Sequence, residues 1–235
     1  MGLEGRELVK RYGGRAVVDR FSLHVDRSQI VGLLGPNGAG KTTIFSLIMG
    51  FMGADHGRVL LDGVDISALA FYRRARLGIG YLPQEPSVFT KATVRGNLEM
   101  ALEGSRDAVA RRDQLLEEFH LMPLANQLAG SLSSGERRRL EIARSLSKSP
   151  RYVLLDEPFS GIDPISIADL QDEIRSLKER GIGIVITDHN VRDTLSITDF
   201  AYLIDRGRLV TSGTPAEIVA DPAARKVYLG AAFQP

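Results

Sequence analysis

The feature that most constrains this chain is one glycine-rich segment, Gly35–Thr42, which reads Gly-Pro-Asn-Gly-Ala-Gly-Lys-Thr. The apolar run 30–34 precedes it and a helical pattern follows, which is the context in which the pattern G-x-x-x-x-G-K-[ST] binds phosphate. Its glycines let backbone N–H groups curl around phosphate oxygens, and the following helix adds the positive end of its dipole. Lys41 then reaches the β- and γ-phosphates, and the Thr42 hydroxyl can ligate Mg²⁺. The alternative is a glycine-rich turn that binds nothing, which the fixed spacing of four residue types disfavours.

Three short apolar runs predict a parallel sheet that is covered on both faces, because such strands carry continuous rather than alternating apolar residues. The runs are 30–34, 152–155 and 184–187. Each is followed at once by polar residues, namely the phosphate loop, Asp156-Glu157 and Asp188-His189. Ligands bind outside the carboxyl ends of parallel strands. We therefore expect these three polar segments to converge on one site.

Other segments indicate structure added to this core. Asp62-Gly63 and Arg206-Gly207 lie between short apolar runs and predict tight antiparallel hairpins. From about residue 97 to 146 the pattern becomes helical, with apolar residues spaced for one face. The predicted fold is α/β: a P-loop NTPase (RecA-like) core with an antiparallel β subdomain and an inserted α-helical subdomain. All of residues 1–235 form one domain in this prediction.

Four polar side chains are candidates for chemistry around the phosphates. Asp156 closes a buried strand and is placed to hold Mg²⁺ through water, while Glu157 is a candidate to orient or deprotonate the attacking water. His189 follows another strand and could donate a hydrogen bond to the γ-phosphate, and Gln84 could contact Mg²⁺ or the water. The alternatives are a solvated turn before Pro158, a structural histidine and an ordinary loop glutamine.

The segment Leu132-Ser133-Ser134-Gly135-Glu136 precedes a helical run. Ser133, with Glu136 three residues later, predicts a capping box, in which each residue satisfies a backbone N–H of the other. A capped helix start with serine hydroxyls and free N–H groups is also an anion site. The capping box and the anion site are compatible with each other. One chain would then contain two phosphate-binding surfaces, the glycine-rich loop and this helix start.

Composition excludes several classes of function. The chain has no cysteine, which rules out disulfide scaffolds, thiolate metal sites and cysteine nucleophiles. Its net charge of +1 gives no electrostatic footprint for a general nucleic-acid binder, so no nucleic-acid partner is expected. The longest apolar runs are strand-sized, and residues 1–10 contain no apolar signal-peptide core. We therefore expect no direct membrane insertion, and the lack of cysteine is compatible with a reducing cytosol.

The order and spacing of these segments resemble the ABC transporter ATPase family over nearly the whole chain. The matching motifs are the Walker A loop (35–42), the Q-loop residue Gln84, the signature loop (132–136), the Walker B strand (153–157), the D-loop (160–163) and the switch histidine His189. The resemblance implies hydrolysis of ATP with Mg²⁺ as cofactor. It also implies a head-to-tail homodimer, in which the Walker A loop of one chain and the signature loop of the other clamp a shared ATP.

The resemblance carries roles over to individual residues of this chain. Tyr12 matches the aromatic position that stacks on adenine, although an ordinary apolar strand residue is the alternative. The full set of predicted ATP-binding residues is Tyr12, Gly35, Pro36, Asn37, Gly38, Ala39, Gly40, Lys41, Thr42 and Thr43, with Ser133, Ser134, Gly135 and Glu136 acting from the partner chain. The predicted catalytic residues are Glu157, His189 and Gln84, and the predicted Mg²⁺ ligands are Thr42, Gln84 and Asp156.

Two departures from the family pattern are visible. The commonest signature is Leu-Ser-Gly-Gly, whereas here Ser134 takes the first glycine position, which bears on how tightly the shared ATP is held. In many members an aspartate follows the switch histidine. Here Asn190 follows His189 and Asp188 precedes it.

Within the family, the chain is most similar to the ATPases of lipopolysaccharide export in Gram-negative bacteria. The similarity is carried by the stretches 76–85, 134–139, 156–166, 186–192 and 226–230. It implies a place on the cytoplasmic face of the inner membrane and integral membrane permease subunits as partners, docked near residues 84–97. Phe89 is a candidate contact for these subunits, and simple core packing is the alternative for this residue. The alternative is the ATPase of a branched-chain amino acid importer, which shares much of the tail. A minor alternative is a non-transport ABC-fold protein that acts on nucleic acid or ribosomes, although the chain has no room for a second cassette or long coiled coils.

Overall fold

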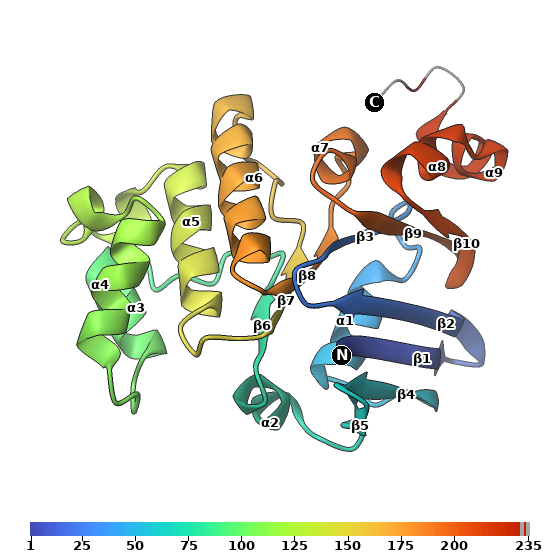
Figure 1. The fold of residues 1–235 in the computed structure, drawn as a ribbon, viewed down its shortest axis with the longest axis horizontal. Coiled ribbons are helices and arrows are strands. Elements are labelled where there is room, and N and C mark those ends of the chain that lie inside the picture. The colour runs from blue at the N-terminus through green and yellow to red at the C-terminus, as the bar shows by residue number, and fades with distance from the viewer. Residues whose placement is uncertain (231–232, 234–235) are drawn as a thin grey trace.

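The computed structural model describes residues 1–230 and 233, and it contains two sheets and a helical lobe (Figure 1). The larger sheet has the strand order β10-β9-β3-β8-β7-β6. Its strands are β3 (Ile30–Leu34), β6 (Ile79–Leu82), β7 (Tyr152–Asp156), β8 (Gly183–Thr187), β9 (Phe200–Asp205) and β10 (Arg208–Gly213). Strands β9, β3, β8, β7 and β6 run parallel to one another, and only β10 is antiparallel.

The three predicted core strands are confirmed at the centre of this sheet. Every residue of β3, β7 and β8 is buried, as expected for parallel strands that are covered on both faces. The register pairs Asp156 at the end of β7 with Thr187 at the end of β8. The residues that follow the two strands therefore start side by side.

The smaller sheet is antiparallel, with the order β2-β1-β4-β5. Its strands are β1 (Gly2–Tyr12), β2 (Arg15–Asp26), β4 (His56–Leu61) and β5 (Val64–Asp65). Both predicted hairpins are confirmed: Asp62 and Gly63 join β4 to β5, and Arg206 and Gly207 join β9 to β10, all four with positive φ. The long strands β1 and β2 escaped prediction because register shifts after Gly5, Leu8 and Lys10 interrupt the alternation of buried and exposed residues.

The helical lobe lies at the opposite end of the molecule from the smaller sheet (Figure 1). Its elements are α3 (Val94–Ala101), α4 (Ala108–Glu118), two 3₁₀ turns (Met122–Leu124 and Ala129–Ser131) and α5 (Ser134–Ser145). The helical region starts three residues before the predicted boundary, because Thr93 caps α3 by accepting a hydrogen bond from the Gly96 N–H at 2.9 Å. Leu115 and Leu140 share one apolar cluster with Val153 and Ile186 of the sheet, so the lobe and the core are packed as one unit.

The remaining helices cover the larger sheet. They are α1 (Lys41–Met49), α2 (Phe71–Arg76), α6 (Pro164–Glu179), α7 (Val191–Leu195), α8 (Pro215–Ala220), α9 (Pro222–Ala224) and a terminal π-helix (Arg225–Leu229). Helix α1 packs against both sheets, since Ile44 and Phe45 belong to the same apolar cluster as Leu3 of β1 and Val31 of β3. The predicted cap of α8 is confirmed, with Thr214 and Glu217 forming a capping box. Among the described residues, no helix has the length and apolar character that spanning a membrane requires.

Candidate nucleotide site

The glycine-rich loop joins buried β3 to α1, as the sequence predicts. Gly40 is the N-cap of α1 with φ of 110°, a conformation that disfavours any side chain. A Cβ at this position would lie 2.7 Å from the Val17 carbonyl oxygen, so the close approach of β2 also requires glycine. The local sequence therefore sets both the curl of the loop and its distance from the neighbouring strand.

Lys41 is held inside the loop. Its ammonium donates hydrogen bonds to the carbonyl oxygens of Gly35, at 2.7 Å, and Pro36, at 3.2 Å. The residue is only 7% exposed, and this burial lowers the pKa of its amine, while the nearby carboxylates, Glu157 foremost, oppose the shift. Among the described residues, the ammonium is thus bonded to two carbonyl oxygens of the loop itself.

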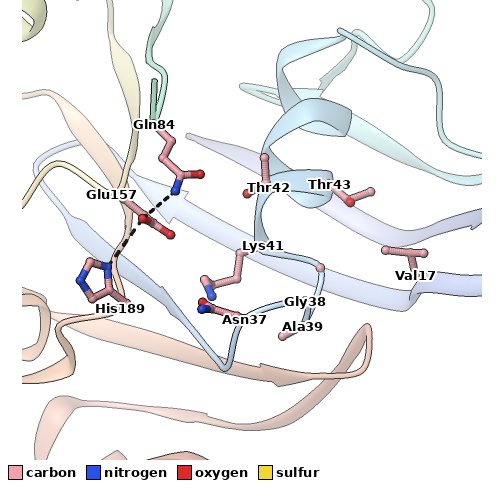
Figure 2. Close-up of a pocket in the computed structure, with 11 residues that line it drawn as sticks. Val17, Asn37, Gly38, Ala39, Lys41, Thr42, Thr43, Gln84, Glu157 and His189 are labelled. Carbon is pink, nitrogen blue, oxygen red and sulfur yellow. Dashed lines mark hydrogen bonds and ion pairs between the residues drawn. The ribbon is translucent and has the colours of Figure 1, made fainter. Parts of the chain in front are cut away.

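A cavity of about 520 Å³ opens beside the loop, and Figure 2 shows its walls. It is lined by Val17, Asn37, Gly38, Ala39, Gly40, Lys41, Thr42, Thr43, Gln84, Glu157 and His189. The loop residues lie on one side and Gln84, Glu157 and His189 on the other, with Lys41 between them. The expected convergence of segments that are far apart in the sequence is therefore present.

Glu157 is the centre of the polar wall. Its Oε2 accepts a hydrogen bond from the Gln84 side-chain N–H at 2.9 Å and lies 3.6 Å from Nδ1 of His189 (Figure 2). The Glu157 backbone has φ of 49°, and its N–H donates to the Thr187 carbonyl at 2.9 Å. This left-handed backbone conformation, which is uncommon outside glycine, turns the chain sharply after β7 and directs the carboxylate into the cavity.

Asp156 lies behind this wall rather than in it. The side chain is buried, Thr187 Oγ1 donates to its Oδ1 at 2.7 Å, and the Tyr81 hydroxyl is 3.5 Å from its Oδ2. Burial raises the pKa of this carboxyl, although the hydrogen bond from Thr187 opposes the shift. Tyr81 and Thr187 were missed by sequence reasoning; the position of Thr187, at the end of the neighbouring predicted strand, was the available signal.

Asp188 holds two loops together next to the cavity. Its carboxylate accepts hydrogen bonds from the backbone N–H groups of Phe159, at 3.0 Å, and Asn190, at 2.9 Å. Burial is the largest effect on this carboxyl and raises its pKa. Asp188 therefore connects the start of the D-loop to the His189 segment.

Three of the predicted nucleotide contacts lie outside the cavity wall. Gly35 and Pro36 lie at the base of the loop, where their carbonyls accept from Lys41. Tyr12 ends β1 with its ring 49% exposed and its hydroxyl 3.1 Å from Sδ of Met52. Val17 of β2 does line the cavity, and the sequence carried no signal for it because β2 itself was not predicted.

The signature segment forms the predicted capping box at the start of α5. Ser133 Oγ accepts from the Glu136 N–H at 3.3 Å, and Glu136 Oε2 accepts from both the N–H and the hydroxyl of Ser133 at 2.8 Å. These bonds lower the pKa of the Glu136 carboxyl. None of residues 133–136 lines the cavity of its own chain. A Cβ on Gly135 would meet the Ser166 side chain at 2.7 Å, so this glycine is needed where α5 packs against α6.

Arg138, one turn into α5, connects the signature helix to the polar wall. Its buried guanidinium donates to the carbonyls of Asp156 and Glu157 at 3.0 and 2.7 Å, and of Pro158 and Pro83 at 3.1 Å each. It also pairs with the Glu141 carboxylate at 2.9 Å. One side chain thus bridges the residues on either side of Glu157 and the residue before Gln84. Sequence reasoning missed this role, because one arginine in the run 137–139 gives no sign of being buried.

The chain belongs to the ABC transporter family. A family profile described as "ABC transporter" matches residues 18–160, which include the loop, Gln84 and Glu157. A second profile, described as "Branched-chain amino acid ATP-binding cassette transporter", matches residues 208–234.

Curated relatives place the chain more finely within this family. It is 51% identical to the lipopolysaccharide export system ATP-binding protein LptB of Acidithiobacillus ferridurans, over 99% of this chain and 98% of the relative. It is 48% identical to the protein of the same name from Escherichia coli (strain K12), with the same coverage. Among solved structures it is similar to the ADP conformation of MJ1267, an ATP-binding cassette of an ABC transporter, with a TM-score of 0.89, 27% identity and coverage of 98% and 99% of the two chains.

Proposed function

We propose that this chain is the ATPase subunit of a lipopolysaccharide export transporter, which hydrolyses ATP to ADP and phosphate and couples this reaction to movement of the lipid. The observation that carries the proposal is similarity at 46–51% identity to LptB proteins over 98–99% of both chains. The cavity supports the reaction, because a phosphate-binding lysine and a carboxylate face each other across it.

In the proposed reaction, Lys41 leaves the carbonyls of Gly35 and Pro36 and binds the β- and γ-phosphates. Glu157 accepts a proton from the attacking water, and His189 donates to the γ-phosphate. The Glu157 carboxylate becomes available for this step when Gln84 moves away from it. Tyr12 stacks on adenine through its half-exposed side chain, with the Lys10 ammonium 5.8 Å from the ring centre.

The chain offers oxygen ligands that suit Mg²⁺, an ion that prefers oxygen and retains several of its waters. Thr42 and Gln84 line the cavity, and the Asp156 carboxylate lies behind it and would act through water. The bound ion would neutralise phosphate charge during hydrolysis. Thr187 fixes the orientation of the Asp156 carboxylate for this purpose.

The proposed assembly is a head-to-tail homodimer in which residues 133–136 of one chain close the cavity of the other. Support comes from the half-open cavity and from the exposed helix start at Ser133, whose N–H groups suit an anion. Ser133→Arg tests this pairing, because a large side chain would block the contact and leave the rest of the chain intact. The expected result is loss of the ATP-dependent dimer in size-exclusion chromatography, with ATP binding retained by the monomer. Dimer formation equal to wild type would contradict the arrangement.

The proposed membrane partners are integral permease subunits, docked over residues 84–97 on the cytoplasmic side of the inner membrane. Phe89 supports this location because it is 52% exposed, with the Arg144 guanidinium 5.0 Å from its ring centre. Arg144 also contacts the Ser87 carbonyl, and Asn97 holds the Phe89 backbone through hydrogen bonds to both its N–H and its carbonyl. The exposed ring is therefore presented on a fixed segment next to Gln84.

A branched-chain amino acid importer is the second candidate, and the profile match over residues 208–234 is the observation that favours it. This match covers only the tail, whereas the LptB relatives extend over nearly the whole chain. Export is therefore the function we propose.

Reconstitution in proteoliposomes distinguishes the two functions. The chain is purified with the permease subunits of its own organism's lipopolysaccharide export system, and ATP-dependent release of lipopolysaccharide to a periplasmic acceptor is measured. We expect release with the wild-type complex and none with Glu157→Gln. Failure to assemble with these permeases, combined with ATPase stimulation by importer permeases and a loaded amino acid binding protein, would overturn the export assignment.

A further inference from the structure

The terminal π-helix, Arg225–Leu229, carries a tyrosine that the mechanism above does not use. The Tyr228 ring packs against an apolar cluster that contains Leu34, the last residue of β3, and Leu195 of α7. Leu34 immediately precedes the phosphate loop, and α7 follows the His189 segment. The tail therefore supports the loop and the switch histidine from the same side.

The Tyr228 hydroxyl is buried, and it has no hydrogen-bond partner among the described residues. A buried hydroxyl without a partner destabilises a folded chain, so such groups are rare and call for a reason. A nearby hydroxyl differs in this respect: that of Thr214, at the start of α8, both donates and accepts a hydrogen bond in its capping box. The unsatisfied group is thus a local feature of Tyr228.

The surroundings of this hydroxyl belong to the nucleotide site. The backbone N–H of Gly35 lies close enough to oppose the rise in its pKa, but the two groups do not reach hydrogen-bond geometry in this structure. The charged groups that act on the hydroxyl are Asp188 and Glu157. Burial raises the pKa of Tyr228 to about 12, so the hydroxyl keeps its proton at neutral pH. It can therefore both donate and accept a hydrogen bond at the point where the loop leaves β3.

Gly35 has a hydrogen-bond partner for which a bound phosphate would compete. In this structure its carbonyl accepts the 2.7 Å hydrogen bond from the Lys41 ammonium. Phosphate oxygens compete for that ammonium, since hydrogen bonds between charged groups are the stronger ones. The Gly35 carbonyl would then lose its hydrogen bond from Lys41 while the loop is binding phosphate.

We propose that Tyr228 is a positioning residue for the phosphate loop: when ATP occupies the site and Lys41 turns to the phosphates, the Tyr228 hydroxyl hydrogen-bonds the Gly35 backbone and holds the start of the loop. The unsatisfied hydroxyl of the nucleotide-free chain becomes satisfied in the bound state. The tail thereby contributes to ATP affinity without touching the nucleotide. This inference rests on the proposed binding of ATP at the loop.

Tyr228→Phe tests the proposal, because it removes the hydroxyl and keeps the ring in its apolar cluster. We expect Kd and KM for ATP to rise about 2- to 12-fold, the value of one neutral hydrogen bond, while kcat stays within about twofold. The melting temperature of the nucleotide-free variant should equal or exceed that of wild type, since an unsatisfied group is lost. The rise in melting temperature on adding ATP should be smaller than in wild type.

Tyr202→Phe is the matched control. The Tyr202 hydroxyl is also shielded, but it accepts a hydrogen bond from the His24 N–H at 3.2 Å, in the apolar cluster between the two sheets. Its loss should lower the melting temperature of the nucleotide-free chain and leave Kd for ATP unchanged. The two variants are therefore expected to show opposite patterns.

The proposal is overturned if Tyr228→Phe binds ATP as wild type does, or if it loses stability without nucleotide while its Kd and KM stay unchanged. The latter result would mean that the hydroxyl is merely structural. The wild-type chain in the same titration separates this outcome from failure of the proposed function. If the wild type does not bind ATP, both the proposed function and the role of Tyr228 are refuted. If the wild type binds ATP and the variant binds it equally well, only the role of Tyr228 is refuted.

Discussion

The phosphate loop and the signature segment both place a helix start where an anion can bind, yet they differ in almost everything else. The loop follows a buried strand, contains a buried lysine and faces a cavity that its own chain completes on two sides. The signature segment presents exposed Ser133 and Ser134 next to buried Gly135, has a neutral capping hydroxyl and does not line this cavity in its own chain. Its Ser133 hydroxyl is already bonded to Glu136.

The difference indicates where each half obtains its affinity. Lys41 and the loop N–H groups can bind phosphate within one chain, because burial and charge are provided locally. Residues 133–136 offer two serine hydroxyls, one of them already bonded to Glu136, and the end of a helix dipole, which is too little to bind a nucleotide from water. In the proposed dimer they would act on a phosphate that the loop of the other chain has already positioned.

Glu157→Gln is the change with the largest expected effect, and it separates binding by the loop from chemistry. The amide cannot accept a proton, so kcat should fall about 10²- to 10⁴-fold while ATP affinity is kept. Phosphate release and nucleotide titration measure the two quantities, and the ATP-bound dimer should accumulate. Glu179→Gln at the exposed end of α6 is the control and should behave as wild type. Unaltered turnover in Glu157→Gln would remove this residue from the base role.

Arg138→Met tests the bridge between the two regions. It leaves the Glu141 carboxylate buried without its guanidinium and releases four carbonyls, so the free energy of unfolding should fall by about 3–5 kcal/mol. Thermal unfolding measures this loss, at about 2–4 °C for each kcal/mol. The control is Arg175→Met, since Arg175 makes an exposed ion pair with Asp172 at 2.6 Å, whose loss should cost about 0–1 kcal/mol. Equal losses in the two variants would show that the bridge is energetically unimportant.

Lys41→Ala tests whether the loop holds the nucleotide by itself. Removing a hydrogen bond between charged groups should weaken ATP binding about 10- to 150-fold, as measured by titration of the isolated chain with Mg²⁺ present. Lys178→Ala, which removes a surface ion pair with Asp199, should leave the affinity unchanged. Retained affinity in Lys41→Ala would contradict the assignment of the loop.

The smallest effect is expected from Ser133→Ala, and it sharpens the comparison because the chain contains a second capping box at Thr214. Ser133→Ala and Thr214→Ala should each cost about 0.5–2 kcal/mol of stability. Only Ser133→Ala should also weaken ATP-dependent dimer formation, as followed by analytical ultracentrifugation. If the two variants dimerise equally well, Ser133 is a cap and nothing more.

Sequence reasoning succeeded where function follows from strand order. The buried runs ending at Leu34, Asp156 and Thr187 predicted a parallel sheet, and the geometry of such a sheet brings their following residues together. Glu157 and His189 were found in this way, whereas the loop was found from its own residue pattern. The hairpins at Asp62 and Arg206 were also predicted, because their conformation depends on residues that are adjacent in the chain.

The features of the fold and site that were not predicted depend on packing between segments that are distant in the sequence. Arg138 meets residues 156–158 only because α5 packs against the end of β7, and nothing in the helix itself shows which of three arginines points inward. The β1 and β2 strands were hidden by bulges, which also hid the contribution of Val17 to the cavity. Tyr228 reaches the loop from a tail whose path cannot be inferred from its local pattern.

The hydrogen bond between Gln84 and Glu157 has a consequence for the basal rate of ATP hydrolysis. An oxygen that accepts from an amide is a poorer proton acceptor for water, so in the proposed reaction this bond would slow hydrolysis until Gln84 moves. Gln84 lies on the segment that also presents Phe89, five residues later. A membrane protein that shifts the segment carrying Gln84 would release the Glu157 carboxylate. ATP would then be hydrolysed mainly when cargo is being transported.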